Sequence, residues 1–249
     1  MFHALLTLIG ILLVAGGLYA LVRGPASLRA AVGALGVLLL VSGNWYGLFR
    51  APPDREMGDV QRIMYVHVPS QWMFMMAVTL SFACSVAYLF RPSWPKDALA
   101  EASAEVGLFF AALGLVLGSI WGKPTWGVYW SWDPRLTSEA IIIVAYAGYL
   151  ALRRFIDDAE RRAVWSAVVG IIIAVDIPII WFSVRWWRSL HQMQSSPSTV
   201  DPDMVRALRW NAFAFLALWL FFLSTRYLIA RARTAREVAP PPLVAEVAT

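Results

Sequence analysis

Two of the three histidines in this 249-residue chain lie at the ends of long apolar runs. His67 lies in the segment MYVHVPS, where one apolar run begins, and His191 lies in WWRSLHQ, just after another run ends. The third histidine, His3, precedes the first run. Because neutral imidazole is a common ligand of iron and other transition metals, His67 and His191 are the candidate metal ligands of this sequence.

A tryptophan-rich stretch, WGKPTWGVYWSWDPRLTSE at residues 121–139, lies between the two histidines. Indole rings have broad, polarizable faces, which suit stacking against a flat conjugated macrocycle. Gly122 and Gly127 permit sharp backbone turns among these rings. Two imidazoles beside such an aromatic surface are what a six-coordinate haem iron requires. A competing interpretation is that the rings only anchor an interfacial segment to lipid headgroups. The candidate indoles are Trp121, Trp126, Trp130 and Trp132.

Charged residues within and around this stretch have separate expected roles. Asp133 followed by Pro134 is a favoured helix start, because Asp caps the first turn and Pro suits the first helical position. Haem carries two propionates, and guanidinium groups pair well with carboxylates. We expect Arg135 to be the propionate partner, since it lies inside the aromatic stretch. The other arginines near the same face are Arg62, Arg185 and Arg188.

The elements that position these residues are expected to be membrane-spanning helices. Hydrophobic residues form 59% of the chain and charged residues only 15%, against roughly 25% charged in a soluble domain. The composition excludes a disordered chain and a secreted disulfide scaffold, and the single Cys84 excludes an internal disulfide and a Cys-x-x-Cys haem-attachment motif. A spanning helix needs about 20 apolar residues. The candidate runs are 4–22, 30–49, 69–90, 104–121, 137–152, 163–183 and 210–230.

The sequence therefore predicts an all-α polytopic membrane protein with six core transmembrane helices, an extra N-terminal helix and a Trp-rich outer loop. Residues 1–29 would form the extra helix and its connector, 30–237 the membrane domain and 238–249 a disordered tail. A cleaved signal peptide is the alternative for the first run, but its start lacks the positive charges of such peptides.

Lysine and arginine predict the orientation of this bundle. Of the 21 Lys and Arg residues, twelve lie in one set of alternate gaps and nine in the other. The richer side is expected to be cytoplasmic, so the chain would start outside and end inside. His67, the tryptophan stretch and His191 then all lie on the outer face, together with ten of the 13 tryptophans.

Two further features suggest other chemistry. Seven of the eight methionines lie at or near the outer side, and thioether sulfur selects copper(I). The cluster Met73–Met76 is nevertheless typical of flexible packing in a helix. Asp176 is the one acidic residue deep in a span, and Pro178 after it is expected to kink the helix. No role is assigned to Asp176.

With these residues identified, the sequence resembles the CcmC family, also called haem exporter protein C, whose members handle haem in cytochrome c maturation. The resemblance runs from about residue 30 to about residue 230 and is strongest in RIMYVHVP (62–69), the stretch 121–139 and IPIIWFSVRWWRSLHQ (177–192). The tryptophan-rich motif alone defines a wider superfamily that includes cytochrome c synthase components. The short chain and the other two segments favour CcmC. The family is usually described with six helices and a cytoplasmic start, so the run 4–22 is a departure.

The resemblance implies that non-covalent, b-type haem is held by His67 and His191 at the extracytoplasmic face of the bacterial inner membrane. It implies delivery of haem to the chaperone CcmE, which docks on the tryptophan-rich loop, and cooperation with CcmD and the ABC transporter pair CcmA–CcmB. Membrane lipid is the remaining expected partner, and no nucleic acid is expected. The candidate haem-binding residues are His67, His191, Trp121, Gly122, Trp126, Gly127, Trp130, Trp132, Asp133 and Arg135.

A carrier is expected rather than an enzyme, because no catalytic base, nucleophile or nucleotide-binding loop is visible. A cytochrome c–haem lyase component would need extra outer mass, and the longest polar gap runs only from about 184 to 209. A haem transmembrane exporter subunit would need a polar or wide path through the spans. An electron-transfer haem protein would need histidines within the spans, where the sequence has none.

Overall fold

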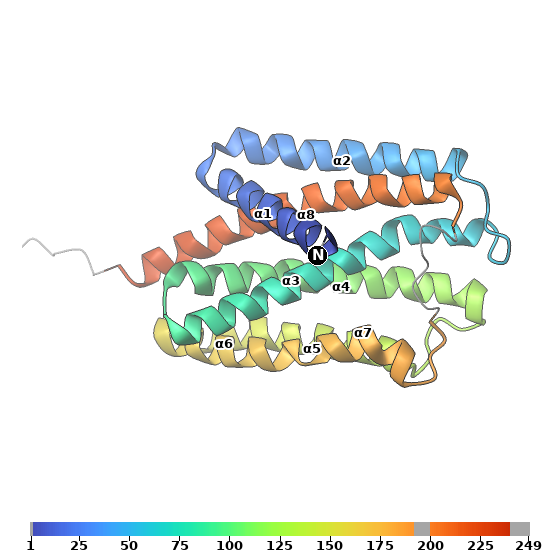
Figure 1. Ribbon diagram of the computed structural model, residues 1–249. Helices are drawn as coiled ribbons and strands as arrows, with labels where there is room; N and C mark the ends of the chain where they lie inside the picture. Colours follow the sequence, from blue (N-terminus) through green and yellow to red (C-terminus); the bar gives the residue numbers. More distant parts are fainter. Residues whose placement is uncertain (1, 192–199, 240–249) are drawn as a thin grey trace, which may run out of the picture.

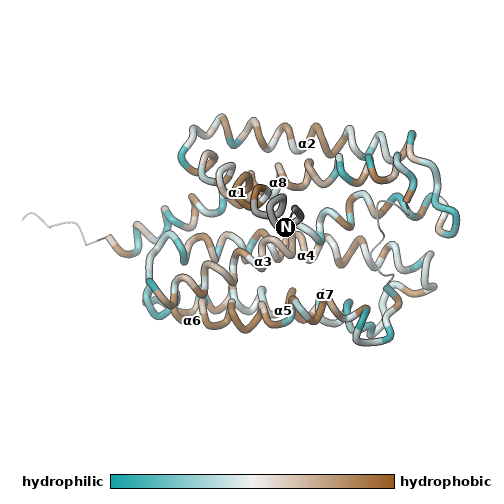
Figure 2. Tube along the Cα trace, in the orientation of Figure 1, coloured by the Kyte–Doolittle hydropathy of each residue, from teal (hydrophilic) through white to brown (hydrophobic). Residues whose placement is uncertain are grey.

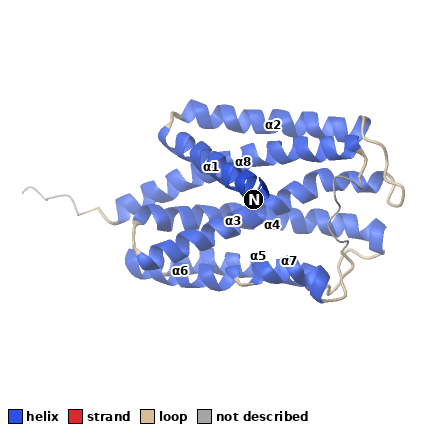
Figure 3. Ribbon diagram, viewed as in Figure 1, coloured by secondary structure: helices blue, strands red, loops and turns tan. Residues whose placement is uncertain are grey.

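The computed structural model describes residues 2–191 and 200–239, with side chains from residue 9 onward. Its helices form one bundle, in which all but the first run along roughly the same axis (Figure 1). In the described ranges there is no strand, and short loops join the helices (Figure 3). The helices are α1 (Phe2–Arg23), α2 (Ala26–Phe49), η1 (Asp59–Ile63), α3 (Met64–Phe90), α4 (Trp94–Trp126), α5 (Pro134–Phe155), α6 (Ala159–Ala174), α7 (Asp176–Trp186) and α8 (Pro202–Glu237).

Six helical units are long and apolar enough to cross a membrane: α2, η1 with α3, α4, α5, α6 with α7, and α8. A shorter apolar helix, Ile9–Arg23 within α1, precedes them and lies obliquely across the bundle in Figure 1. The expected six core helices and extra N-terminal helix are therefore confirmed. Most of the expected tail, 238–249, lies outside the described residues.

Apolar side chains occupy both the interior and the outer surface of the bundle. Hydrophobic residues follow the middle of the helices, while hydrophilic residues gather toward their ends (Figure 2). Val144 is 72% exposed and Leu38 is 67% exposed, as lipid-facing residues would be. Phe74, Tyr146 and Trp219 are buried in the core. This distribution explains why the composition is too apolar for a soluble protein.

The two ends of the bundle differ in chemistry. We call the end with the longer connections the aromatic end; its connections are residues 50–58, residues 127–133 and the segment that follows Trp186. The opposite end is the ionic end; its turns are residues 24–25, 91–93 and 156–158, and the last turns of α8 lie beside them (Figure 1). His67, the tryptophan stretch and His191 all belong to the aromatic end, as the sequence predicts.

Buried charges fasten α4 to α5 at the ionic end. Asp97 and Glu101 lie one turn apart on α4, and Arg153 of α5 lies between them. Arg153 donates to both oxygens of Asp97, at 2.7 and 2.8 Å, and to Glu101 at 3.0 Å. All three residues are at most 5% exposed. The bidentate geometry compensates the cost of burying these charges.

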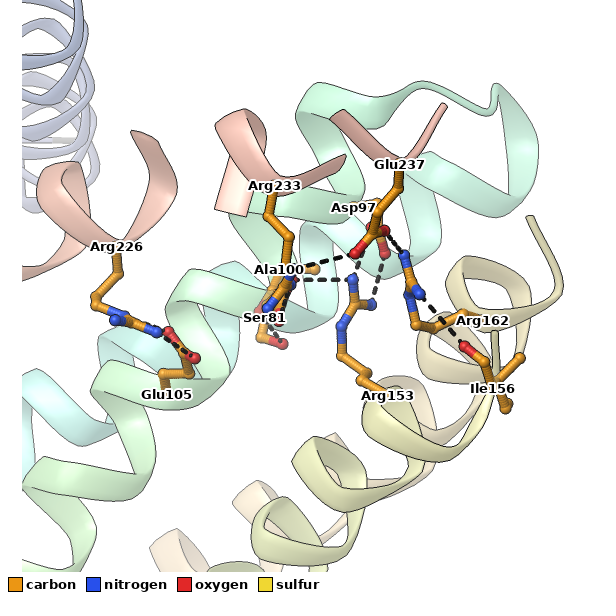
Figure 4. Close-up of polar contacts among 11 residues, drawn as sticks. Ser81, Asp97, Ala100, Glu105, Arg153, Ile156, Arg162, Arg226, Arg233 and Glu237 are labelled. Atoms are coloured by element: carbon orange, nitrogen blue, oxygen red, sulfur yellow. Dashed lines mark hydrogen bonds and ion pairs between the residues drawn. The ribbon is translucent and has the colours of Figure 1, made fainter. Parts of the chain in front are cut away.

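Further ion pairs tie α8 and α6 to the same cluster (Figure 4). Arg226 of α8 makes two hydrogen bonds of 2.6 Å to Glu105, which lies one turn beyond Glu101 on α4. Arg233 of α8 also pairs with Glu101. Arg162 of α6 pairs with Glu237 of α8. The ionic end is therefore a network that joins four helices.

Both α4 and α8 are longer than their apolar runs, and these pairs lie along the extension of each helix at the ionic end. The run 104–121 predicts neither the start of α4 at Trp94 nor the acidic residues in its first turns. The run 210–230 likewise stops short of both ends of α8. Charged residues usually indicate a loop in a membrane protein, but here they lie within helices and pair with one another.

The run 163–183 is one span made of two helices, α6 and α7, which meet at Val175. Pro178 has no N–H to donate to the carbonyl of Ala174, so the regular helix is interrupted there. The expected disturbance next to Asp176 is therefore confirmed.

Candidate functional site

The last turns of α4 place two tryptophans at the aromatic end. Trp121 and Trp126 are helical, and α4 ends at Gly127, whose φ of 79° lies in the left-handed region that favours glycine. At Gly122, a Cβ would lie 3.0 Å from the Trp126 ring. The beginning of the stretch 121–139 continues α4 and its end starts α5 at the expected helix start, so the Trp-rich outer loop consists of residues 127–133.

The side chain of His67 packs against the face of α4 that carries Gly114 and Gly118. Its Nδ1 lies 3.0 Å from the carbonyl oxygen of Gly114. Its ring centroid lies 5.6 Å from that of Trp121, in an edge-to-face arrangement. A Cβ on Gly118 would come within 3.1 Å of the imidazole. Because a carbonyl only accepts, Nδ1 must carry the proton, and Nε2 keeps a lone pair that a metal can bind.

His191 lies just after α7, against the second indole. Its ring centroid is 4.9 Å from that of Trp126. Its Nδ1 lies 3.5 Å from Oδ1 of Asp133, which is longer than a well-formed hydrogen bond. Each candidate ligand therefore contacts its own tryptophan from the end of α4.

Asp133 joins the two segments on either side of the site. Its Oδ1 accepts the Arg135 N–H at 2.9 Å, so the expected helix cap is confirmed. Its Oδ2 accepts the Leu190 N–H at 2.7 Å, a contact that no local sequence pattern indicates. Asp133 thereby holds the backbone next to His191 against the start of α5.

The charge states of His191 and Asp133 suit a metal site. Burial lowers the pKa of His191 to about 4, the charge of Arg135 adds to this effect, and Asp133 only partly opposes it. His191 is therefore neutral at pH 7, the form that binds a metal. Burial acts to raise the pKa of Asp133, but hydrogen bonds from Leu190, Ser189 and Arg135 outweigh it. The net pKa is lowered, and Asp133 is ionised.

Arg135 forms no ion pair with another described residue, and neither do the exposed Arg185 and Arg188. Arg135 is half-buried, and its guanidinium donates no hydrogen bond to another described residue. Its charge contributes to the lowered pKa of His191. By contrast, Arg62 pairs with Asp59 at 2.8 Å and also donates to backbone carbonyls at the end of α2. Arg62 thus fits the expected propionate partner less well than Arg135.

The remaining tryptophans of the stretch, Trp130 and Trp132, contact each other. Trp132 is 82% exposed, and its ring meets that of Trp130 edge to face at 5.7 Å. The four candidate indoles therefore form two pairs. Trp121 and Trp126 face the histidines, whereas Trp130 and Trp132 belong to the exposed loop.

Two residues that sequence reasoning did not assign lie directly beneath His67. Gln71, one turn further along α3, donates to Glu139 of α5 at 2.6 Å. Glu139 is only 7% exposed. A signal was present in the spacing: His67 and Gln71 are four residues apart on α3, and Gly114 and Gly118 are four apart on α4.

The imidazoles of His67 and His191 suit a metal that is already coordinated by most of its ligands. In the described ranges, no group of three or more His, Cys, Asp or Glu residues could hold a bare metal ion. Two imidazoles suffice for the iron of haem, because the macrocycle supplies the other four nitrogens. Met73, from the cluster considered for copper, is 4% exposed and packs in the core.

Comparison with known proteins places the chain in a family. The family model for heme exporter protein C, CcmC, matches residues 17–239. "Heme exporter protein C" of Bradyrhizobium diazoefficiens is 38% identical over 191 residues, which cover 75% of this chain and 73% of the relative. The protein of the same name in Haemophilus influenzae is 38% identical over 86% of this chain and 87% of its own length. A "putative cytochrome c biosynthesis ccmC-like mitochondrial protein" of Marchantia polymorpha is 34% identical over 74% of this chain and 81% of its own. This chain is thus a multi-pass helical membrane protein that belongs to the heme exporter protein C (CcmC) family.

Proposed function

We propose that this protein holds haem at its aromatic end, at the extracytoplasmic face of the bacterial inner membrane, and delivers it to the chaperone CcmE during cytochrome c maturation. The observation that carries the proposal is the pairing of each histidine with its own indole: His67 with Trp121 and His191 with Trp126. Two such pairs at one end of a bundle suit a flat iron macrocycle better than a bare ion.

Each residue has a role in this proposal. His67, through its free Nε2, and His191, as a neutral imidazole, would hold the iron of a non-covalently bound, b-type haem. Trp121 and Trp126 would support the macrocycle, and Arg135 would neutralise a propionate. When bound, haem supplies the iron and the vinyl groups that maturation requires; the chain's own residues bind and orient it.

The loop pair Trp130 and Trp132, of which Trp132 is exposed and Trp130 half-buried, is proposed to be where the chaperone docks. Aromatic residues are enriched at protein interfaces because they bury much area with few torsions. Trp132, at 82% exposed, is available for such contact. CcmD, the CcmA–CcmB transporter pair and membrane lipid are the other proposed partners. In this view the protein is a carrier that assists attachment of haem to the chaperone.

The packing of the interior favours a carrier over a pore for haem. Phe74, Phe110, Tyr146 and Trp219 are at most 2% exposed and fill the middle of the bundle. Beyond them, the salt bridges of Arg153 with Asp97 and Glu101 of α4 occupy the ionic end. We therefore propose that haem stays at the aromatic end of this chain.

The test is to purify the protein in detergent, load it with haem and offer the chaperone. We expect His67→Ala and His191→Ala each to weaken the Soret absorption of bound haem and to reduce the amount of haem recovered on CcmE. His3→Ala is the matched control and should leave both unchanged. Normal transfer from the His67→Ala/His191→Ala double variant would contradict the proposed function.

A further inference from the structure

The contacts beneath His67 connect it to a helix that also holds His191. On α4, Gly114 and Gly118 lie one turn apart and leave room for side chains of α3. We call this surface the glycine seat. His67 lies over Gly118 and bonds to the carbonyl of Gly114. Gln71 lies over Gly114 so closely that a Cβ there would collide with its amide. Two residues one turn apart on α3 thus rest on two glycines one turn apart on α4.

The amide of Gln71 is held from the other side by α5. Its Nε2 donates to Oε1 of Glu139 at 2.6 Å. Glu139 is nearly fully buried, and Gln71 is its one hydrogen-bond partner among the described residues. A buried carboxyl group inside a membrane bundle is costly and is therefore a candidate for a specific role.

The same helix, α5, holds the other histidine through its first residues. Asp133 caps α5 and binds the Leu190 N–H, which fixes the segment that carries His191. Glu139 lies six residues further on, which is about 9 Å along a helix axis. One rigid element therefore contacts the supports of both candidate ligands.

We propose that Glu139 is a positioning residue for His67: through Gln71 it fixes the α3 turn on its glycine seat, and together with Asp133 it sets the separation of the two imidazoles. This inference rests on the proposed haem binding. It predicts that breaking the Gln71–Glu139 bond leaves haem bound by one histidine but disturbs the second ligand. Outer partners of metal ligands typically affect affinity by about 10- to 100-fold.

The experiment measures the spin state of ferric haem by absorption and electron paramagnetic resonance in purified variants. Glu139→Met and Gln71→Met remove the bond with little change of volume, and each should give a five-coordinate, high-spin fraction and about 10-fold weaker haem retention. Glu139→Gln keeps an acceptor oxygen and should stay close to wild type. The exchange Gln71→Glu with Glu139→Gln reverses donor and acceptor, and should restore the low-spin spectrum.

A haem-free readout accompanies the spectra. Diethyl pyrocarbonate modifies accessible imidazoles, so His67 of the haem-free Met variants should react faster than in wild type, as measured by peptide mass spectrometry. Ser81→Ala is the structural control, because it removes a buried α3–α4 hydrogen bond of 3.2 Å away from the site. It should change neither readout.

The outcomes separate this inference from the function on which it rests. If the low-spin spectrum of wild type depends on His67 but both Met variants match wild type, the inference is wrong and the function stands. If the exchange variant is no better than the single Met variants, the hydrogen bond is not the cause and the inference is also overturned. If the wild-type spectrum does not depend on His67, the proposed function itself fails.

Discussion

The two ends of this bundle differ in how their buried charges are paired. At the ionic end, the two terminal nitrogens of Arg153 pair with the buried carboxylates of Asp97 and Glu101, and only its Nε has no partner among the described residues. At the aromatic end, Arg135 has no hydrogen-bonded partner for its guanidinium among the described residues, and the buried Nε1 of Trp121 likewise has none. Groups that satisfy one another stabilise a fold, whereas groups left without partners in a defined place are available to a ligand.

The comparison predicts that substitutions at one end affect stability and those at the other affect haem. The largest effect is expected for Arg153→Met, which leaves Asp97 and Glu101 buried without their cation. Breaking a buried pair in this way costs about 3–5 kcal/mol. We expect a lower melting temperature in detergent and a poor yield, while the haem spectrum of the folded fraction stays normal. A melting temperature equal to that of wild type would show that the network does not fasten the helices.

Arg135→Gln tests the aromatic end in the same way. Loss of a charged hydrogen bond to a propionate costs about 1.5–3 kcal/mol, so haem affinity should fall by roughly 10- to 100-fold with little change in melting temperature. Arg62→Gln is the control, since Arg62 is already bonded to Asp59 and to α2. Equal loss of haem affinity in the two variants, measured by haem titration, would refute the distinct role of Arg135.

Two helix caps provide a matched pair, one at each end. Asp133 uses separate oxygens to cap α5 and to bind the Leu190 N–H, whereas Asp158 caps only its own helix, α6. Asparagine can cap a helix but has one acceptor oxygen. Asp133→Asn should therefore lose about 1 kcal/mol of support for the His191 segment, and haem affinity should fall about fivefold. Asp158→Asn should leave haem affinity unchanged; a haem defect as large as that of Asp133→Asn would contradict the account.

The smallest effect on haem is expected for Trp132→Ala. Its ring is largely exposed and contacts Trp130 rather than either histidine. Substitution of an exposed side chain should change stability by no more than about 0.5 kcal/mol and should leave the haem spectrum intact. Co-purification with CcmE should nevertheless decrease. Undiminished recovery of the chaperone would remove the proposed docking role.

The apolar runs were sufficient to predict the helices, because lipid selects long apolar segments whatever they pack against. The dipeptide Asp133-Pro134 was likewise sufficient for the cap of α5, since capping depends on local geometry. The apolar run 104–121 did not predict the first turns of α4, although Ser93 and the proline at its first positions are local signals of a helix start. The pairing of Asp97 with Arg153, 56 residues away, could not be predicted from either segment alone.

The candidate site shows the same division between local and distant information. The types of His67, His191 and the nearby tryptophans indicated the chemistry, and the structure brings these residues to one end. The separation of the tryptophans into two pairs depends on where α4 ends, at Gly127. The bond from Gln71 to Glu139 spans 68 residues and depends on how three helices meet, which no spacing within one segment contains.

The central claim is that His67 and His191 bind the same haem iron at the aromatic end. The most direct measurement is the electron paramagnetic resonance spectrum of ferric haem bound to the wild type and to the His67→Ala/His191→Ala double variant. We predict a low-spin signal in the wild type that is absent from the double variant and returns, at least in part, when free imidazole is added. An unchanged low-spin signal in the double variant without imidazole would contradict the claim.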